Sequence, residues 1–299
     1  MLKILSVIVL FGSTSLFTFC QNYLDIFKID YALNTPATFD SIQNTTQVQE
    51  INADLSIPIV VTEKTAILTG LVYDFTHASF LPNAAKTSIH GITLKAGLNI
   101  KHTSKLSGTY LFLPKLASDL RRINRTDFQF GGAVLMKYQK SKFLNYKFGV
   151  YANSELFSTI LVPMFGLYFL NKSKKLEIKL LLPLAGDLNY VIANKMRVGL
   201  NFKGQVRSYH LNDLSGNKTT YLTRSTNNAF AYWQYSLDGG LNLQVGLGRS
   251  IARSYRMYDE RVSFALPLVY FNDSRTQLNQ DFEDTWFFKI GLFYRLDLQ

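Results

Sequence analysis

The closing segment of the chain, Trp286–Gln299, reads Trp-Phe-Phe-Lys-Ile-Gly-Leu-Phe-Tyr-Arg-Leu-Asp-Leu-Gln. Side chains alternate between the two sides of a strand, so its even-numbered residues share one side, and that side is apolar. The odd-numbered side carries the charged residues Lys289, Arg295 and Asp297. This alternation predicts a strand with one side toward an apolar environment and the other toward a polar interior.

The first 20 residues have the pattern of a secretory signal peptide. Lys3 precedes an apolar run, and residues 12–15 interrupt that run, so it is too short to span a bilayer. We expect cleavage after Cys20, which leaves residues 21–299 as the mature domain. The alternative is a lipoprotein acylated at Cys20, although Phe19 is larger than the residue such a signal carries there. Cleavage would remove the single cysteine and exclude disulfides and thiolate metal sites.

The composition fits a barrel that spans a membrane with strands. The chain has 299 residues, of which 47% are hydrophobic and 18% charged, and its formal net charge is +11. The mean hydropathy is near zero, which excludes a bundle of membrane-spanning helices but suits strands in which every second residue faces lipid. A secreted chain rarely meets nucleic acid, so we assign the basic charge to lipid headgroups, an anion-selective lumen, or solvated rims and loops.

Alternating segments recur along the chain and predict the number of strands. They are residues 22–33, 47–61, 65–75, 87–101, 106–113, 128–138, 144–152, 158–170, 176–182, 196–210, 229–236, 241–255, 261–271 and 286–298. If residues 188–192 form a further strand, residues 261–271, which contain Pro267, leave the wall, because single-chain barrels have even strand numbers. We predict an all-β fold: a single closed antiparallel transmembrane β-barrel with an even number of strands, namely 14, with 12 as the alternative.

The connecting segments carry further expectations. Residues 34–46, 81–86, 114–127 and 211–228 are expected to be displayed loops, and residues 117–124 a short helix. Pro58 interrupts a predicted strand and is expected at a rim or a bulge, because proline cannot donate a hydrogen bond to the ladder.

Local motifs add a resemblance that covers the whole chain. They are the Asn-Lys-Ser-Lys turn at 171–174, Leu181-Leu182-Pro183 ahead of Asn189-Tyr190, and the closing strand Phe288–Leu296. In these features the chain resembles outer-membrane barrels of the Bacteroidetes type, from a family defined only as a domain of unknown function. The resemblance implies an outer-membrane location and contact with the barrel-assembly machinery. One departure is the end Leu298-Gln299, where many such proteins have the aromatic residue that this machinery reads.

A series of basic residues lies opposite the apolar sides of the predicted strands, where a barrel has its lumen. The series is Lys95, Lys101, Lys137, Lys147, Lys175, Lys179, Arg197, Lys203, Arg207, Lys289 and Arg295, with Glu177 and Asp54 as the clearest acidic residues there. Two interpretations stay open: a positive lumen that favours anionic solutes, and a lumen closed by salt bridges. A second group, Arg249, Arg253, Arg256 and Arg261, is expected at a rim near lipid phosphates or in solvent.

Aromatic residues near the strand ends predict the girdles that anchor a barrel at membrane interfaces. They are Tyr138, Tyr146, Tyr151, Tyr255, Tyr258, Tyr270 and Trp286. The core of a soluble β-sandwich is the main structural alternative for them.

The spacing His77-x-Ser79 is the most enzyme-like feature and is similar to the His-x-Ser of outer-membrane phospholipase A. That family also uses an asparagine about a dozen residues on, where this chain has Gly91, and Asn83 is the nearby substitute. The histidines at 77, 90, 102 and 210 show no metal-binding spacing. There is no phosphate-binding loop and no dinucleotide fingerprint. We therefore expect no enzyme, cofactor or metal, with a lipid hydrolase as the least favoured alternative.

The sequence thus predicts a passive channel or small-solute transporter with a basic lumen in the outer membrane. The alternative is a structural or binding barrel with a filled lumen and displayed loops. The expected partners are outer-membrane lipids, the assembly machinery and anionic small solutes, and not nucleic acid.

Overall fold

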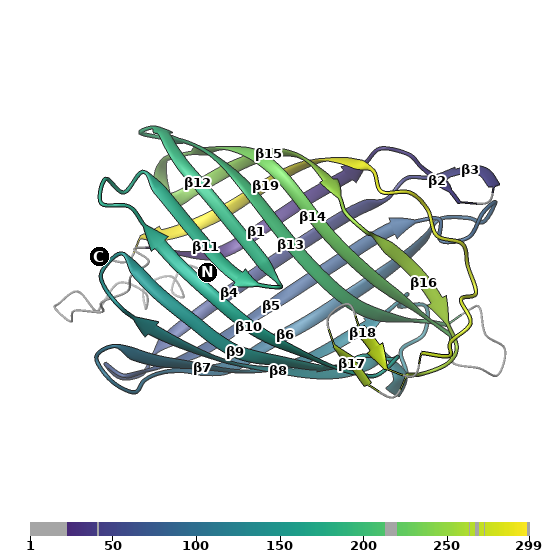
Figure 1. Ribbon diagram of the computed structural model, residues 1–299, viewed down its shortest axis with the longest axis horizontal. Helices are drawn as coiled ribbons and strands as arrows, with labels where there is room; N and C mark the ends of the chain where they lie inside the picture. Colours follow the sequence, from purple (N-terminus) through teal and green to yellow (C-terminus); the bar gives the residue numbers. More distant parts are fainter. Residues whose placement is uncertain are drawn as a thin grey trace, which may run out of the picture.

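The computed structural model describes residues 23–40, 42–212, 220–262, 264–266, 269–271 and 273–297 (Figure 1). The predicted signal peptide, residues 1–20, lies outside these residues and stays a prediction. Among the described residues, no helix is long and apolar enough to cross a membrane.

Fourteen strands form a closed antiparallel barrel, as predicted. The wall strands are β1 (Tyr23–Asn34), β4 (Gln49–Val60), β5 (Thr65–Ala78), β6 (Thr87–Lys101), β7 (Leu106–Ser118), β8 (Phe128–Gln139), β9 (Leu144–Ser154), β10 (Thr159–Leu170), β11 (Leu176–Leu182), β12 (Ala185–Ala193), β13 (Met196–Leu211), β14 (Thr220–Ser236), β15 (Leu241–Ser250) and β19 (Trp286–Asp297). The closing strand β19 pairs with β1 on one edge and with β15 on the other, which seals the wall.

The structure settles which of the two doubtful segments belongs to the wall, and the number of wall strands is even, as predicted. Residues 188–192 lie in β12, and the segment 261–271 leaves the wall to form the small hairpin of β17 (Phe264–Leu266) and β18 (Val269–Phe271). Two further short strands, β2 (Ala37–Phe39) and β3 (Ile42–Thr46), pair with each other in the connection between β1 and β4. β16 (Ser254–Tyr258) pairs with the first part of β14.

Alternation along the wall strands separates an apolar outer side from a polar inner side. In β19, Trp286, Phe288 and Ile290 are exposed on the outside, whereas Phe287 and Phe293 are buried inside. β1 contains a bulge between Asp25 and Phe27, which shifts the alternation by one residue. The bulge therefore places Tyr23 and Asp25 on the same inner side as Lys28 and Asp30.

Several connections differ from the expectation. Residues 117–124 form no helix: β7 continues to Ser118, and the helical turn is η2 (Arg125–Asp127), capped by Asn124. The expected loop 211–228 is wrong from Thr220 onward, because these residues belong to β14. Pro58 lies within β4 but beyond Leu55, where the β1–β4 ladder ends, so its missing N–H interrupts no pairing on that edge.

The barrel has two different ends. The terminal end is the side on which Tyr23 and Asp297 lie, and it carries short turns at 61–64, 102–105, 140–143, 171–175, 194–195 and 237–240. The opposite side, here called the loop end, carries the long connections, including 251–285 between β15 and β19, although the connections 155–158 and 183–184 on this side are short. Short turns at one end and long loops at the other are typical of outer-membrane barrels.

A short hairpin breaks the wall at the loop end. β11 and β12 end well before their neighbours β10 and β13 (Figure 1). The β12–β13 ladder stops at Lys203, and the Gly204 N–H donates to the carbonyl of Leu184 at 2.8 Å. From Gln205 onward, β13 therefore has no wall neighbour on this edge.

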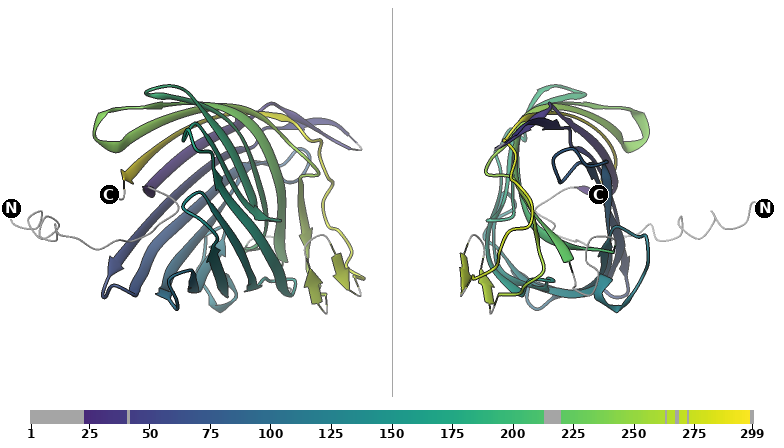
Figure 2. Two further views of the ribbon diagram at one scale, coloured as in Figure 1. Left: turned by 60° about the vertical axis from the view of Figure 1, so that its left-hand side comes forward. Right: turned by 90° about the vertical axis from the view of Figure 1, so that its right-hand side faces the viewer.

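The free part of β13 turns into the lumen together with its partners. His210 of β13 forms a parallel bridge with Ser118 of β7, although the wall strands β8 to β12 separate these two strands. We call residues 205–211, 220–225 and 254–258, which belong to β13, β14 and β16, the inner layer. The right-hand view of Figure 2 looks into the loop end and shows green strand, the colour of the adjoining ends of β13 and β14, inside the ring of strands. The inner layer crosses the lumen.

Both sides of the inner layer are packed. On one side, Tyr209, Leu222 and Met257 join a cluster with buried residues of the β4–β7 wall, such as Ile89 and Ala117. On the other side, Tyr221 and Tyr258 pack with Ile160, Val162 and Met164 of β10. The lumen is therefore filled with apolar side chains at the loop end.

We expect Leu222→Ala to lower the free energy of unfolding by about 2–5 kcal/mol, because the side chain is fully buried and its removal leaves a cavity. Leu237→Ala, at an exposed position in the β14–β15 turn, is the matched control and should change little. The measurement is urea unfolding of the refolded protein in detergent. Equal effects of the two substitutions would contradict the packing of the inner layer.

Candidate functional site

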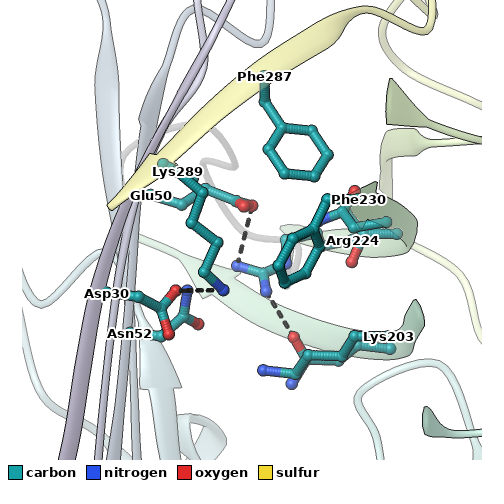
Figure 3. A pocket seen from close by; sticks show the side chains of 12 residues that line it. Asp30, Glu50, Asn52, Lys203, Arg224, Phe230, Phe287 and Lys289 are labelled. Atoms are coloured by element: carbon teal, nitrogen blue, oxygen red, sulfur yellow. Dashed lines mark hydrogen bonds and ion pairs between the residues drawn. The ribbon is translucent and has the colours of Figure 1, made fainter. Parts of the chain in front are cut away.

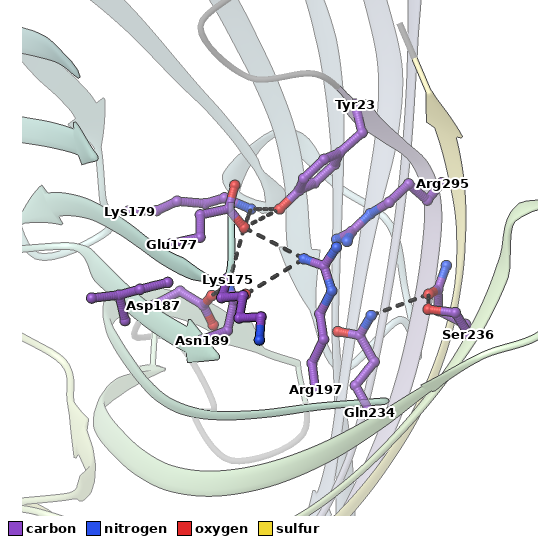
Figure 4. A network of polar contacts seen from close by, with 12 residues as sticks. Tyr23, Lys175, Glu177, Lys179, Asp187, Asn189, Arg197, Gln234, Ser236 and Arg295 are labelled. Carbon is purple, nitrogen blue, oxygen red and sulfur yellow. Dashed lines mark hydrogen bonds and ion pairs between the residues drawn. The ribbon is translucent and has the colours of Figure 1, made fainter. Parts of the chain in front are cut away.

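At the terminal end, one polar network reaches across the lumen (Figure 4). The Tyr23 hydroxyl of β1 donates to Glu177 Oε2 of β11 at 2.5 Å, and Lys179 Nζ contacts both groups. The Arg295 guanidinium lies 3.6 Å from the centroid of the Tyr23 ring and pairs with Asp25 at 2.7 Å. These contacts join β1 and β19 to the opposite wall and narrow the lumen here.

Neighbouring strands complete this network. Asn189 Nδ2 donates to Glu177 Oε2 at 3.0 Å, and Arg197 Nη1 lies 3.8 Å from the same oxygen. The Tyr232 hydroxyl donates to Asp187 at 3.1 Å. The basic groups in this region are therefore compensated by carboxylates, as buried charges must be.

A pocket lies in the lumen between this network and the inner layer (Figure 3). Lys289 Nζ pairs with Asp30 Oδ1 at 2.8 Å, and Arg224 Nη1 lies 3.7 Å from Glu50 Oε1. Lys203 also lines the pocket, and among the described residues it makes no hydrogen bond or ion pair. The remaining lining residues are Ala32, Asn52, Gln205, Thr226, Asn228, Phe230 and Phe287.

Buried charged contacts hold the inner layer against the wall. On the side of β5, Arg207 pairs with Asp74, and Arg224 Nη1 donates to Thr76 Oγ1 at 2.7 Å. Both arginines are largely buried, and Asp74 is 1% exposed. Removing one partner of such a pair is costly because it leaves a buried charge uncompensated.

The opposite side of the inner layer is held by Glu155, in the connection between β9 and β10. Its Oε2 accepts hydrogen bonds from the backbone N–H and the hydroxyl of Ser208, both at 2.6 Å. Its Oε1 pairs with Lys115 Nζ of β7 at 2.9 Å. Two residues further along β13, His210 Nδ1 lies 2.7 Å from Asp127 Oδ1. The carboxylate of Glu155 thus links Ser208 of the inner layer to Lys115 of the wall strand β7.

The connection from β18 to β19 covers the inner layer at the loop end. Arg275 pairs with Asp273 at 2.8 Å, and its guanidinium lies 4.1 Å from the centroid of the Tyr258 ring. The hydrogen bond from Arg275 holds the pKa of Asp273 below its usual value. This pair stays charged at neutral pH and adds a further layer above the filled lumen.

A family model described as a domain of unknown function (DUF6268) matches residues 21–295. The chain belongs to the DUF6268 family. This confirms the predicted membership of a family without an assigned function, and the Bacteroidetes type stays a prediction.

One solved structure similar to this DUF6268 chain is an outer membrane channel from Pseudomonas putida F1. The two sequences are 9% identical and the TM-score is 0.47. The alignment covers 90% of this chain and 94% of that chain. The toluene transporter TodX of P. putida has 9% identity and a TM-score of 0.39, covering 93% of this chain and 90% of that chain. No curated protein matches the sequence.

Most members of the predicted basic series of this DUF6268 barrel lie on the polar side of their strands, and several of them form ion pairs. Lys95 Nζ lies 2.5 Å from Asp54 Oδ1 and 2.7 Å from the hydroxyl of Ser56. Lys137 of β8 and Lys147 of β9 are direct cross-strand neighbours. Lys101 ends β6 on the side of Lys95. Lys175 is exposed in the turn before β11. The series is therefore distributed along the whole lumen.

The sequence pattern did not predict most of the acidic residues that pair with the basic series and the inner layer. They are Asp25, Asp30, Glu50, Asp74 and Glu155. Asp74 and Glu50 could have been found, because each alternates with outward-facing residues of its strand. Asp25 is hidden by the bulge in β1, and Glu155 lies outside any strand, so alternation gives no signal for either.

The expected arginine group and aromatic girdle are only partly formed. Arg253 is buried against Phe282, at 5.2 Å from the ring centroid, whereas Arg256 pairs with Asp281 at 2.6 Å and Arg249 lies over Trp286 on the outside. Arg261 is exposed.

Among the aromatic residues, Tyr138, Tyr146 and Trp286 are exposed on the outer surface. Tyr255 and Tyr258 are buried in the inner layer and Tyr151 packs beside it, so these three were wrongly predicted as girdle residues. The side chain of Tyr270 lies outside the described residues.

The His77-x-Ser79 spacing does not form a nucleophile–base pair. His77 Nδ1 is hydrogen-bonded to the Ser88 hydroxyl at 2.9 Å. The Ser79 hydroxyl lies 2.8 Å from the carbonyl oxygens of Leu81 and of Ala84. Its proton is therefore directed at backbone carbonyls and not at the imidazole. Within the described part of the chain, no group of three or more metal-ligating side chains is placed to hold a metal ion.

We expect Asp74→Ala to lower the free energy of unfolding by about 3–5 kcal/mol, because Arg207 would be left buried without its carboxylate. The double substitution with Arg207→Leu should lose less than the sum of the single substitutions. Asp54→Ala is the matched control, since its pair with Lys95 is partly exposed and should contribute no more than about 1 kcal/mol. Urea unfolding in detergent tests this, and additive effects at positions 74 and 207 would contradict it.

Proposed function

We propose that the protein is an outer-membrane channel for small solutes that is closed in the state described here and opens when the inner layer moves. The observation that carries the proposal is the inner layer itself, which crosses the lumen and is packed on both sides. A solute cannot pass the loop end while this layer is in place. Passive, permanently open conduction is therefore not the function that this geometry supports.

The outer surface supports a membrane location. Large apolar side chains are exposed on strands all around the wall, among them Leu94 at 53%, Phe165 at 67% and Leu200 at 60%. A soluble protein rarely exposes such a continuous apolar surface, whereas a bilayer covers it. We therefore propose outer-membrane lipids as its surroundings, the assembly machinery as the partner that inserts it, and the terminal end as the periplasmic side.

The way the inner layer is attached supports movement. Apart from one bridge to β7, its contacts with the β4–β10 wall are made by side chains, such as Glu155 with Ser208 and Asp127 with His210. The β12–β13 ladder ends at Lys203, before the inner layer begins. Withdrawing the layer would break these contacts and leave the wall ladder below Lys203 intact.

The charges of the lumen support anionic solutes. Lys203 lines the lumen pocket and forms no direct hydrogen bond or ion pair among the described residues. Charged rings and pore walls select ions of the opposite sign. We therefore propose that the opened lumen favours anions over cations.

The second candidate is a barrel with a permanently filled lumen that serves as a scaffold for its outer loops. The apolar packing on both sides of the inner layer favours it, because moving the layer would expose those side chains. The two candidate functions differ in whether the protein, or any well-folded variant of it, conducts ions across a bilayer.

We expect the wild-type protein to pass little current in a planar bilayer. A variant in which a two-residue Asn-Gly turn replaces residues 206–225 should give steady, anion-selective current, because β13 and β14 would then turn within the wall. The measurement is single-channel conductance with the reversal potential under a salt gradient. Large steady conductance of the wild type would contradict the closed state.

A milder variant guards against misfolding of the shortened barrel. Glu155→Gln with Asp127→Asn keeps the chain length and weakens two attachments of the inner layer, so we expect brief openings. Lys101→Gln, which touches none of these attachments, is the control. If both well-folded variants stay silent, the scaffold function replaces the channel.

A further inference from the structure

The turns at the terminal end carry a strong excess of positive charge. Together the six turns contain eight lysines but only two carboxylate residues, Glu63 and Asp238. All of these lysines are exposed, and they are Lys64, Lys105, Lys140, Lys142, Lys172, Lys174, Lys175 and Lys195. The rim of the barrel at the terminal end is therefore positively charged.

Two neighbouring turns hold most of this charge (Figure 1). They are residues 140–143, between β8 and β9, and residues 171–175, between β10 and β11. Because β9 pairs with β10 and the Leu170 N–H donates to the carbonyl of Phe143 at 2.9 Å, the two turns lie side by side. Neither turn contains an aspartate or a glutamate. We call their lysines the basic patch: Lys140, Lys142, Lys172, Lys174 and Lys175.

Hydrogen bonds hold the backbone of both turns. In the longer turn, the side-chain Oδ1 of Asn171 accepts from the backbone N–H groups of Lys175 and Leu176 at 2.8 and 3.1 Å. In the shorter turn, the Ser141 hydroxyl accepts from the Phe143 N–H at 3.1 Å. The backbone therefore keeps the lysines of the basic patch within one region of the rim, where their charges act together on an approaching anion.

Aromatic and apolar side chains on the outer surface place the basic patch next to a membrane interface. Tyr138 of β8 and Tyr146 of β9 are cross-strand neighbours close to the shorter turn, and both are exposed. Further along the wall, Phe148 of β9 and Phe165 of β10 are also cross-strand neighbours, and both are exposed. Tyrosines at the ends of barrel strands lie at the level of the lipid headgroups, with apolar side chains beyond them in the hydrocarbon. The basic patch therefore lies at the level of the headgroups or just outside it.

We propose that the basic patch binds the headgroups of anionic phospholipids in the leaflet at the terminal end. Ammonium groups attract the headgroup phosphate, and each lysine close to an anionic membrane surface adds to this attraction. Lysine side chains are also long enough to reach a headgroup while their stems lie along apolar surface. The inference rests on the membrane location proposed above, and it does not depend on whether the barrel conducts.

Phosphatidylglycerol with a spin-labelled acyl chain is the probe, added at low content to the folded barrel in phosphatidylcholine vesicles. Electron paramagnetic resonance gives its association constant with the barrel relative to that of spin-labelled phosphatidylcholine. We expect a preference of about threefold or more for phosphatidylglycerol, which decreases as added salt screens the charges. Equal association of the two lipids would overturn the proposal.

Substitutions in the longer turn test whether the basic patch is responsible. The triple variant Lys172→Gln, Lys174→Gln, Lys175→Gln should lose most of the preference for phosphatidylglycerol. These side chains are exposed, so the variant should fold normally. Arginine at the same three positions should retain the preference, because the charge is kept.

A second triple variant removes the same amount of charge from three other turns of the rim. It is Lys64→Gln, Lys105→Gln, Lys195→Gln, and we expect it to keep most of the preference for phosphatidylglycerol. Equal losses in the two glutamine variants would show attraction to the whole rim and would overturn the basic patch as the site.

Conductance separates this inference from the proposed channel. A preference for phosphatidylglycerol in a barrel whose variants with a removed or loosened inner layer never conduct would overturn the channel and leave the basic patch standing. Conduction by those variants without any lipid preference would overturn the basic patch and leave the channel standing.

Discussion

The arrangement of the lumen depends on the part of β13 beyond Lys203, where one edge of the strand has no neighbouring wall strand to hydrogen-bond its backbone. Because β11 and β12 end early, the edge of β13 beyond Lys203 has no strand beside it, and buried backbone groups must be hydrogen-bonded. The chain meets this requirement across the lumen. The Ser208 N–H donates to Glu155 and its carbonyl accepts from Gln129, while the His210 carbonyl accepts from the backbone N–H of Asp119. The inner layer follows from these bonds and from the apolar packing that accompanies them.

Along the barrel axis, the lumen has three parts that differ in the kind of interaction that fills them. The terminal network is a set of closely paired charges around Glu177, and the loop end is a packed apolar core interrupted by the buried pairs of Arg207 and Glu155. Between them lies the pocket, in which Lys289 pairs with Asp30 and Lys203 forms no direct hydrogen bond or ion pair among the described residues. Buried ion pairs add little net stability but penalise arrangements that separate them, so the pairs fix where the inner layer sits.

The alternation of apolar and polar residues was enough to predict most of the wall strands. It did not predict most of the carboxylates that pair with the basic residues in the lumen. The wall strands were predicted because an apolar outer side repeats every second residue, and even the departure of residues 261–271 followed from the need for an even count. Residues 220–228 were read as a loop because a strand inside the lumen contacts polar groups and loses the outward apolar signal. Glu155 lies outside any periodic segment, so its contact with Ser208 had no sequence signal.

The sequence by itself determined the barrel and its even strand number, and it predicted the side of each strand on which the basic residues lie. These depend on local period and on composition, which every strand carries in its own residues. Only the tertiary structure decided that the lumen is filled at one end and that Arg207 and Lys289 pair with Asp74 and Asp30. It also decided that Lys203 forms no direct ion pair within the described part of the chain. These features depend on the lengths of neighbouring strands and on contacts between residues far apart in the chain. A local sequence pattern predicts neither of them.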